Sequence, residues 1–215
     1  MNKKESEIYE FINNLQNPIK LHTNKKYNNP WINQNNYNNL LTFLLAKQNA
    51  KYILIGEAPG RKGCLQCGVP FCDDYTLEKL VKIDNNKIKK SKETSAQRIY
   101  YAFEDNFIAW NAFPYQPCDE YGNNRPPSIE ELKFGNEYLK KFLNIFYSKN
   151  KEIILIGNKA EYACKNFKIE YKKIIHPSCY ADNKRKELKY EYGLNGWLKY
   201  INSIIPDLKI NNLQV

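Results

Sequence analysis

The sequence has 215 residues, a formal net charge of +10 and a hydrophobic content of 42%, and 14% of all residues are aromatic. A chain of this length and composition can bury a sizeable core, which excludes disorder as a description of the whole. The positive charge favours a polyanionic partner, nucleic acid before a membrane surface, although the many Lys, Asn, Ile and Tyr residues are also what an AT-rich genome would encode.

Two features of the sequence bear on the compartment. No stretch is long and apolar enough to span a membrane, and residues 1–7 are not followed by an apolar signal segment. Six cysteines without a secretory signal favour reduced thiols. We therefore expect an intracellular protein, cytoplasmic or nuclear and not secreted, that is a monomer without a membrane partner.

The first 49 residues predict an N-terminal helical extension. Residues 4–16 have the spacing of a short amphipathic helix, whose apolar face carries Ile8, Phe11, Ile12 and Leu15. Residues 17–36 are rich in Asn and Pro and predict a long irregular connection. A cluster of leucines then predicts a helix at about 37–49.

The run Tyr52-Ile-Leu-Ile is apolar without alternation, which is typical of a strand buried on both faces of a parallel sheet. It leads directly into Gly56-Glu57-Ala58-Pro59-Gly60. The glycines allow a sharp turn and a close approach to a ligand, and the proline stiffens the turn. Glu57 is thereby expected at the carboxyl edge of the strand, where open α/β sheets build their sites.

Residues 61–72 are dense in Gly and Cys and predict a loop. Its three close cysteines, Cys64, Cys67 and Cys72, admit two interpretations: zinc ligands that need a distant fourth, or thiols of the loop and core. The candidates for a fourth ligand are Cys118, Cys164 and Cys179. We favour the thiols and expect no metal.

Helices are predicted at 76–83 and at 94–104, the second with Thr94 or Ser95 as its N-cap, and the polar run 85–92 between them predicts a solvated loop. Further helices are expected from Ser128, which can form a capping box with Glu131, at about 158–167 and at about 197–204.

Three more apolar runs predict strands, at 107–110, 153–156 and 173–175. Strands that alternate with helices are typical of a parallel sheet with helical crossovers. We therefore predict an α/β fold: a three-layer α/β/α sandwich around a central, mostly parallel four-stranded sheet, in a single domain of residues 1–215.

Three of these strands end in chemically capable side chains, Glu57, Asn111 and His176, and right-handed crossovers would gather them along one edge. Asn111 is either a turn cap or an amide that reads one edge of a base. His176, followed by Pro-Ser, favours chemistry over a structural role, whereas His22 is expected to be solvated. Phe71 either packs in the core or stacks on a planar ligand.

Taken in order, Gly56-Glu57-Ala58-Pro59-Gly60, Gly68-Val69-Pro70-Phe71, Asn111 and His176-Pro177-Ser178 resemble the motifs of the uracil-DNA glycosylase superfamily over about residues 50–200. The branch most similar has a Gly-Glu-Ala/Gly-Pro-Gly first motif and a Gly-x-Pro-Phe segment. The resemblance implies the fold of that superfamily and a monofunctional DNA glycosylase. Such an enzyme hydrolyses the N-glycosidic bond of uracil, or of a related deaminated base, flipped out of single- or double-stranded DNA.

The resemblance also implies roles for individual residues. Glu57 matches the carboxylate that positions or activates water, and His176 the histidine that stabilises the departing base. The substrate-binding positions are Gly56, Ala58, Phe71, which stacks on the base, and Asn111, which pairs with its edge. The DNA-binding positions are Pro59, Gly60, Arg61, Lys62, Ser178, Tyr180, Lys184 and Arg185, of which Tyr180 is our candidate for the intercalating side chain.

The sequence departs from the branch in two places. The branch carries an iron–sulfur cluster, but no cysteine precedes Glu57, so its cysteine pattern is absent and we expect no cofactor. Gly60 stands where some relatives have a Tyr that excludes the thymine methyl group, which leaves the preferred lesion open. A different class of function is a catalytically weak DNA-binding member of the same fold, acting as a scaffold or sensor; Glu57, Asn111 and His176 together argue against it.

Overall fold

The computed structural model describes residues 2–16, 21, 23–82, 90–178, 181, 183, 187, 190–191 and 193–208. Four parallel strands form the central sheet, and their spatial order is β3 (Phe107–Asn111), β2 (Tyr52–Gly56), β5 (Glu152–Ile156) and β6 (Tyr171–Ile174). The chain passes from β2 to β3 on one side and later to β5 on the other. The order therefore reverses beside β2, the place where open α/β sheets bind ligands.

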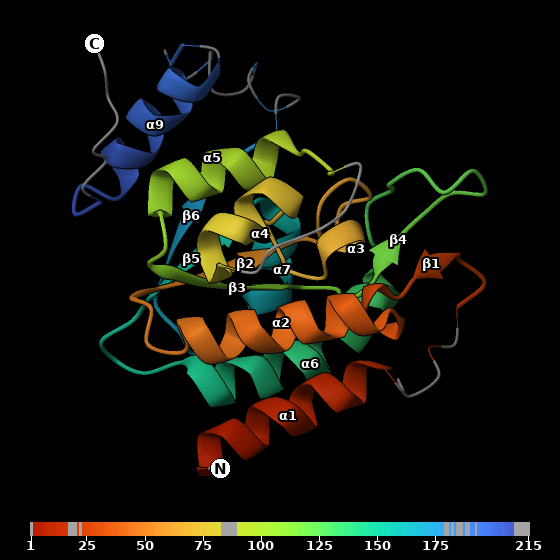
Figure 1. The fold of residues 1–215 in the computed structure, drawn as a ribbon. Coiled ribbons are helices and arrows are strands. Elements are labelled where there is room, and N and C mark those ends of the chain that lie inside the picture. The colour runs from red at the N-terminus through yellow and green to blue at the C-terminus, as the bar shows by residue number, and fades with distance from the viewer. Residues whose placement is uncertain are drawn as a thin grey trace.

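Helices cover both faces of this sheet (Figure 1). On one side lie α1 (Lys3–Gln16), α2 (Gln34–Lys47) and α6 (Ile129–Phe146). The helix α1 packs on α2 and on α6, and these two pack on β3. On the other lie α4 (Asp74–Val81) and α5 (Thr94–Phe103), and α9 (Gly193–Ile204) packs against α5 and β6. The helix α7 (Asn158–Cys164) packs on β2 and β5.

The strands and the helix ends follow from local sequence. All five residues of β2 and all five of β3 are buried, as expected for apolar strands covered on both faces. Ser128 and Glu131 form the predicted capping box at the start of α6, each satisfying a backbone N–H of the first turn. The apolar face of α1 is buried against the same core as the sheet.

Several local predictions were wrong. The stretch 17–36 holds the short strand β1 (Tyr27–Asn28), which pairs with β4 (Gln116–Pro117), and a 3-10 turn, η1 (Pro30–Ile32). The loop 61–72 contains a helical turn, α3 (Cys64–Cys67). Elements this short carry no apolar periodicity by which a sequence could reveal them.

The N-cap of α5 also differs from the prediction, because Glu93 occupies that position in place of Thr94 or Ser95. The Glu93 side chain does not cap the helix; its backbone N–H instead donates to Asp73 Oδ2 at 2.8 Å. A tertiary contact thus fixes where α5 begins. Within the described ranges, no helix is both long and apolar enough to cross a lipid bilayer.

Candidate active site

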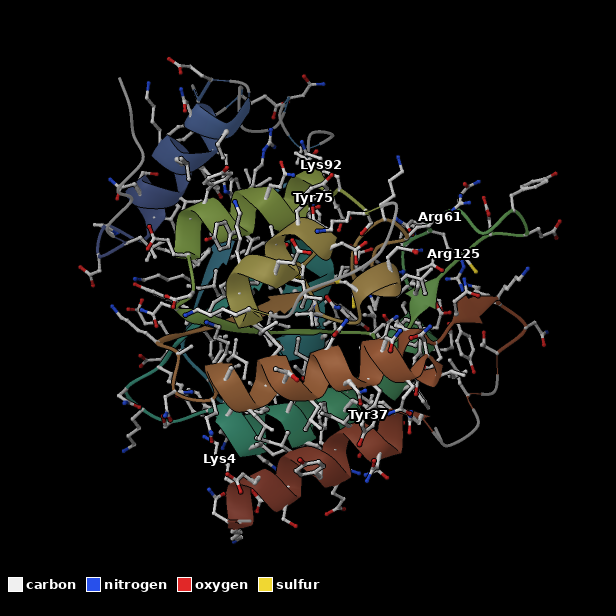
Figure 2. The ribbon with its side chains drawn as sticks, viewed as in Figure 1. Lys4, Tyr37, Arg61, Tyr75, Lys92 and Arg125 are labelled. Carbon is white, nitrogen blue, oxygen red and sulfur yellow. The ribbon has the colours of Figure 1, made fainter. Side chains whose placement is uncertain are left out.

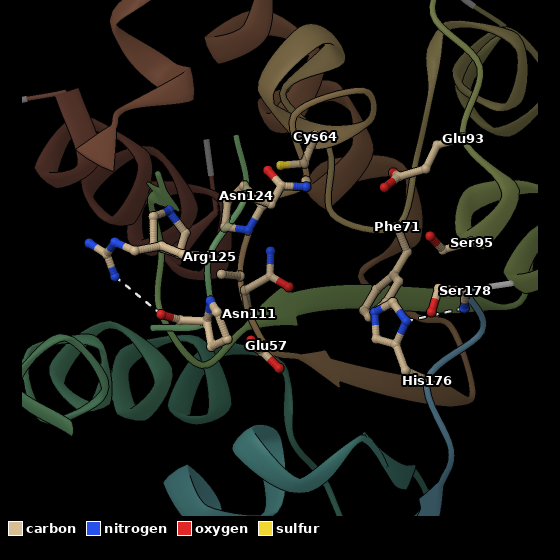
Figure 3. A pocket seen from close by; sticks show the side chains of 15 residues that line it. Glu57, Cys64, Phe71, Glu93, Ser95, Asn111, Asn124, Arg125, His176 and Ser178 are labelled. Carbon is tan, nitrogen blue, oxygen red and sulfur yellow. Dashed lines mark hydrogen bonds between the residues drawn. The ribbon is translucent and has the colours of Figure 1, made fainter. Parts of the chain in front are cut away.

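The carboxyl ends of β2, β3 and β6 surround one cavity of about 530 Å³ (Figure 3). Glu57, Asn111 and His176 all line it, so the structure brings together the three side chains that end predicted strands. Ala58 and Phe71 line it as well. The volume lies within the range of about 300–1,000 Å³ that small-molecule sites occupy.

The floor of the cavity depends on Gly56, which pairs with Asn111 in the register of β2 and β3. A Cβ at position 56 would lie 2.6 Å from Asn111 Oδ1 and 2.7 Å from Cε2 of Phe71. Such distances are shorter than van der Waals contacts, so only glycine lets the ring and the amide approach the strand this closely. Phe71 has a φ of 54°, a left-handed conformation that is uncommon for a non-glycine residue and clusters at functional sites.

Asn111 is 3% exposed, yet its side-chain amide makes no hydrogen bond to another described residue. Buried amides are normally hydrogen-bonded, because an unpaired polar group costs about 1–3 kcal/mol. Figure 3 shows this amide directed into the cavity beside Phe71. The Asn111 side chain therefore offers an NH₂ group as donor and a carbonyl oxygen as acceptor to a ligand in the cavity.

His176 presents one ring nitrogen to the backbone and the other to the cavity. Ser178 N–H donates to His176 Nδ1 at 3.1 Å, so the neutral ring carries its proton on Nε2. The other nitrogen faces the cavity in Figure 3, and the ring centroid lies 6.4 Å from that of Phe71. The imidazole can thus donate a hydrogen bond to an acceptor held against Phe71.

Two helices hold the His176 segment in place. From α5, buried Arg98 donates to the carbonyls of Pro177 at 3.0 Å and Ser178 at 3.3 Å. From α9, the hydroxyl of Tyr200 accepts from the backbone N–H of Ile175 at 2.9 Å. The segment is therefore fixed on both sides of the imidazole, which a preorganised hydrogen-bond donor needs.

Glu57 lies between this cavity and a second one of about 650 Å³, which it shares with His176 and Lys159. Desolvation raises the pKa of the Glu57 carboxyl above its ordinary value, and the positive charge of Lys159 opposes that rise. The carboxyl group has no hydrogen-bond partner among the described residues. It is available to a water molecule or a substrate.

The cavity also contains a carboxyl group that the sequence reasoning missed. Glu93 lines it beside Ser95, and its Oε1 would lie 2.6 Å from a Cβ at Gly60. Burial first, and then the negative charge of Asp73, raise the pKa of Glu93 to about 7, against the effect of its hydrogen bond with Ser95. No local signal marks Glu93, because it follows a polar run and is buried only by tertiary contacts.

The raised pKa predicts a pH-dependent stability. The folded protein keeps a proton on Glu93 where the unfolded chain has lost it, so this contribution is complete below about pH 4.5 and is lost as the pH rises to about 7. Glu93→Gln cannot ionise. We expect it to gain up to about 3 kcal/mol in free energy of unfolding over the wild type above pH 7, and nothing below pH 4.5.

Urea unfolding at the two pH extremes measures this difference. Glu170→Gln, which changes an exposed carboxylate before β6, is the matched control and should show no such gain. A Glu93→Gln advantage that is the same at both pH values would contradict a buried, protonated Glu93.

The rim opposite Glu93 consists of residues that the sequence analysis did not single out: Pro117, Asn124, Arg125 and Pro126. Arg125 binds the buried Glu131 through two hydrogen bonds of 2.6 and 2.7 Å. Figure 3 shows Asn124 and Arg125 across the cavity from His176. The run Asn-Arg-Pro-Pro followed by a capping box was a usable signal for a fixed segment at this position.

The three close cysteines are buried. Burial raises the pKa of the Cys64 and Cys72 thiols well above the ordinary value. Cys67 Sγ lies 3.3 Å from the Cys72 carbonyl, and Cys72 Sγ lies 3.3 Å from the Asp73 carbonyl. Among the described residues, no group of three or more His, Cys, Asp or Glu side chains could hold a metal ion. Cys179 lies outside that part of the chain.

The predicted DNA-binding residues fall into three groups. Pro59, Gly60 and Ser178 line the cavity. Arg61 and Lys62 are exposed but do not line it, and Arg61 Nη1 donates to Asn123 Oδ1 at 2.8 Å. The predictions for Tyr180, Lys184 and Arg185, and that for His22, lie outside the described residues.

Comparison with known proteins identifies the family. The sequence model of the Uracil DNA glycosylase superfamily matches residues 43–199, more than half of the chain. The crystal structure of wild-type SMUG2 from Pedobacter heparinus matches with a TM-score of 0.69 at 18% identity, over 96% of this chain and 98% of that one, and it confirms the predicted α/β fold. No curated protein sequence matches at a significant level. The protein belongs to the uracil-DNA glycosylase superfamily, as its motifs predicted.

Proposed function

We propose that the protein is a monofunctional DNA glycosylase that removes uracil flipped out of DNA and leaves an abasic site. Membership in the superfamily supports a DNA glycosylase in general. The observation that carries the finer proposal is that Glu57, Asn111, Phe71 and His176 line one cavity of about 530 Å³, which has room for a flipped base. Flipping the base into it costs a few kcal/mol, which backbone contacts and stacking must offset.

In the proposed reaction, the bond between C1′ of the sugar and N1 of uracil breaks, and its electron pair leaves with the base. The negative charge spreads onto O2, where the Nε2–H of His176 can donate a hydrogen bond. This donor is fixed in advance, since Nδ1 already accepts from Ser178 N–H. A preoriented donor in a site that excludes water stabilises such a charge strongly.

The sugar that remains is an oxocarbenium-like cation, and water must add to its C1′. Ionised Glu57 can orient that water, accept its proton and stabilise the positive charge of the sugar. Glu57 then releases this proton to solvent and uracil takes one up from solvent, so that the products are neutral uracil and an abasic sugar, and Glu57 is ionised again. Glu57 must be ionised for this role.

Lys159 gives a test of that requirement. Because its positive charge opposes the raised pKa of Glu57, Lys159→Gln should raise this pKa further. The acid limb of the pH–rate profile for single-turnover uracil excision is then expected to move to higher pH. Lys173 also lines the second cavity, but its ammonium group pairs with Glu161 at 2.6 Å. Lys173→Gln is therefore the matched control, and its acid limb should lie at the same pH as that of the wild type. Identical limbs in wild type and Lys159→Gln would contradict the coupling.

Asn111 is the proposed reader of the base. Its Nδ2 can donate to O4 of uracil while Oδ1 accepts from N3–H. Cytosine presents the opposite pattern of donor and acceptor, and would leave buried polar groups unpaired. Phe71 would stack on the face of either pyrimidine, which adds affinity without selecting between them.

Asn111→Asp is therefore expected to weaken this selection. The aspartate lacks the donor for O4, so uracil excision should fall roughly 10- to 100-fold, and the ratio of uracil to cytosine excision should fall with it. Competition between the two substrates in one reaction measures the ratio. An unchanged ratio would remove Asn111 from the role of base reader.

The proposal itself is tested with oligonucleotides that each contain one uracil, hypoxanthine, thymine or cytosine, incubated with the protein in EDTA and then cleaved with alkali at abasic sites. We expect cleavage at uracil. Tight binding without cleavage at any base would favour a DNA-binding scaffold or sensor instead. Activity that EDTA abolishes would point to metal chemistry, and either result overturns the proposal.

A further inference from the structure

A short hairpin projects from the rim of the cavity. We call residues 118–124 the rim hairpin: Cys118 and Asn124 form an antiparallel bridge at its base, and Asp119 N–H donates to the Asn123 carbonyl at 3.0 Å. Its last residue, Asn124, lines the cavity, and so does Pro117, which directly precedes the hairpin. The tip of the hairpin, residues 120–122, lies beyond the cavity wall.

The tip has a fixed conformation. Asp119 Oδ1 accepts from the backbone N–H groups of Tyr121 at 2.9 Å and Asn123 at 2.7 Å, and Asp119 Oδ2 accepts from Asn123 Nδ2 at 3.0 Å. Gly122, with a φ of 78°, supplies the left-handed residue that closes the turn. A side chain at the tip is thus presented with little backbone entropy left to lose on binding.

The base of the rim hairpin is tied to both neighbouring segments. Arg125 donates to the Cys118 carbonyl at 3.1 Å, and Gln116 Nε2 donates to Asn124 Oδ1 at 2.8 Å. From the loop after β2, Arg61 donates to Asn123 through its guanidinium and to Asn124 Oδ1 through its backbone N–H at 3.0 Å. Arg61 and Arg125 accordingly lie near each other, on the side of the molecule from which the rim hairpin extends (Figure 2).

The tip carries Tyr121, which at 83% is the most exposed large hydrophobic side chain among the described residues. Its ring has no aromatic or cationic neighbour within the described part of the chain. Because it is exposed, the Tyr121 ring contributes little to the stability of the free protein. It offers a planar face to a partner instead.

We propose that Tyr121 is a base-stacking contact for DNA, which the rim hairpin holds beside the cavity to stack on a base near the flipped nucleotide. The proposal rests on DNA as the substrate of the cavity. Tyr121 is three residues from Asn124 in the cavity wall, a separation of at most about 10 Å. Successive nucleotides of a strand are about 3.4 Å apart along the duplex axis, so bases within a few steps of the flipped one are in reach.

The charges of the hairpin favour a base over the phosphate backbone as the contact. Asp119 and Glu120 precede Tyr121, and phosphates would be repelled by their carboxylates. Hydrogen bonds from the Asn123 and Tyr121 backbone hold the pKa of Asp119 below its usual range, so its negative charge persists. Stacking on an aromatic ring tolerates any base, because each has a π face.

Binding measurements with an uncleaved oligonucleotide test this role. Tyr121→Ala should bind about tenfold more weakly than wild type, whereas Tyr121→Phe, which keeps the ring, should bind as wild type does. Tyr171→Ala is the matched control, since it removes a 42%-exposed tyrosine at the amino end of β6, away from the carboxyl edge. Equal affinities of Tyr121→Ala and wild type, or no binding of DNA by any variant, would overturn the proposal.

Tyr121→Trp provides a direct probe of the contact. All three native tryptophans, Trp31, Trp110 and Trp197, are 0% exposed, so quenching by acrylamide would report the introduced ring. We expect DNA to protect this ring from acrylamide and to lower its fluorescence by stacking. Full quenching by acrylamide at saturating DNA would overturn the proposal.

The experiments distinguish a failure of the stacking role of Tyr121 from a failure of the proposed glycosylase activity. Uracil excision by a Tyr121→Ala variant with wild-type affinity would remove the stacking role and leave the glycosylase intact. A protected Tyr121→Trp ring in a protein that excises no base would do the reverse.

Discussion

A Glu57→Gln variant is expected to excise uracil about 10²- to 10⁴-fold more slowly than wild type, because the amide cannot accept a proton from the attacking water. The side chain keeps its size, and Glu57 forms no hydrogen bond to another described residue that the change would break. Affinity for uracil-containing DNA should therefore be retained. Single-turnover rates and binding by fluorescence anisotropy separate the two effects.

The same experiment on Glu170→Gln controls for the loss of one negative charge near a polyanion. This carboxylate is exposed and precedes β6 rather than following a strand, so both rate and affinity should match wild type. A Glu57→Gln rate within a fewfold of wild type would mean that another group activates the water, and Glu93 is the other carboxyl group that lines the cavity among the described residues.

Gly56→Ala is expected to damage the site by a different route. The new methyl group would lie 2.6 Å from Asn111 Oδ1 and 2.7 Å from Phe71 Cε2, so the Asn111 amide and the Phe71 ring must both shift. A displacement of about 1 Å can cost about 10²-fold in rate, and overpacking of this kind costs about 1–3 kcal/mol in stability. We expect uracil excision and the affinity for free uracil to fall together.

Gly193→Ala separates the loss of fit from the loss of stability. Gly193 has a φ of 80°, but a Cβ there would meet nothing within 4 Å. The variant should lose about 1 kcal/mol through backbone strain and excise uracil at the wild-type rate. A Gly56→Ala protein that is destabilised to a similar extent and still excises uracil normally would contradict the close packing described for Gly56.

Much of the fold was predictable because it is encoded locally. Three apolar runs without alternation specified β2, β3 and β5, and Ser128 with Glu131 specified the start of α6. The strand β6 covers Tyr171–Ile174 in place of the predicted 173–175, because it is an edge strand that is largely exposed and not an apolar run. What the sequence could not reveal depends on tertiary contact. The strand β1 exists only through its pairing with β4, and the N-cap position of α5 depends on the bond from Glu93 N–H to Asp73.

The residues of the candidate site were likewise predictable only where local sequence places them. Glu57, Asn111 and His176 each follow a predicted strand, so the parallel topology was enough to bring them together. Glu93 joins them only because the segment before α5 packs beside Gly60 and Gly63. Nothing in the local sequence distinguishes such a carboxyl group from a solvated one.

In the proposed mechanism, the Glu57 carboxylate, the Asn111 amide and the His176 imidazole act on one base. A crystal structure of Glu57→Gln bound to a duplex with a single uracil tests it most directly. We predict an extrahelical uracil stacked on Phe71, with O4 and N3 at the Asn111 amide and O2 at Nε2 of His176. Uracil that remains in the duplex, or a base bound away from these three side chains, would contradict the account.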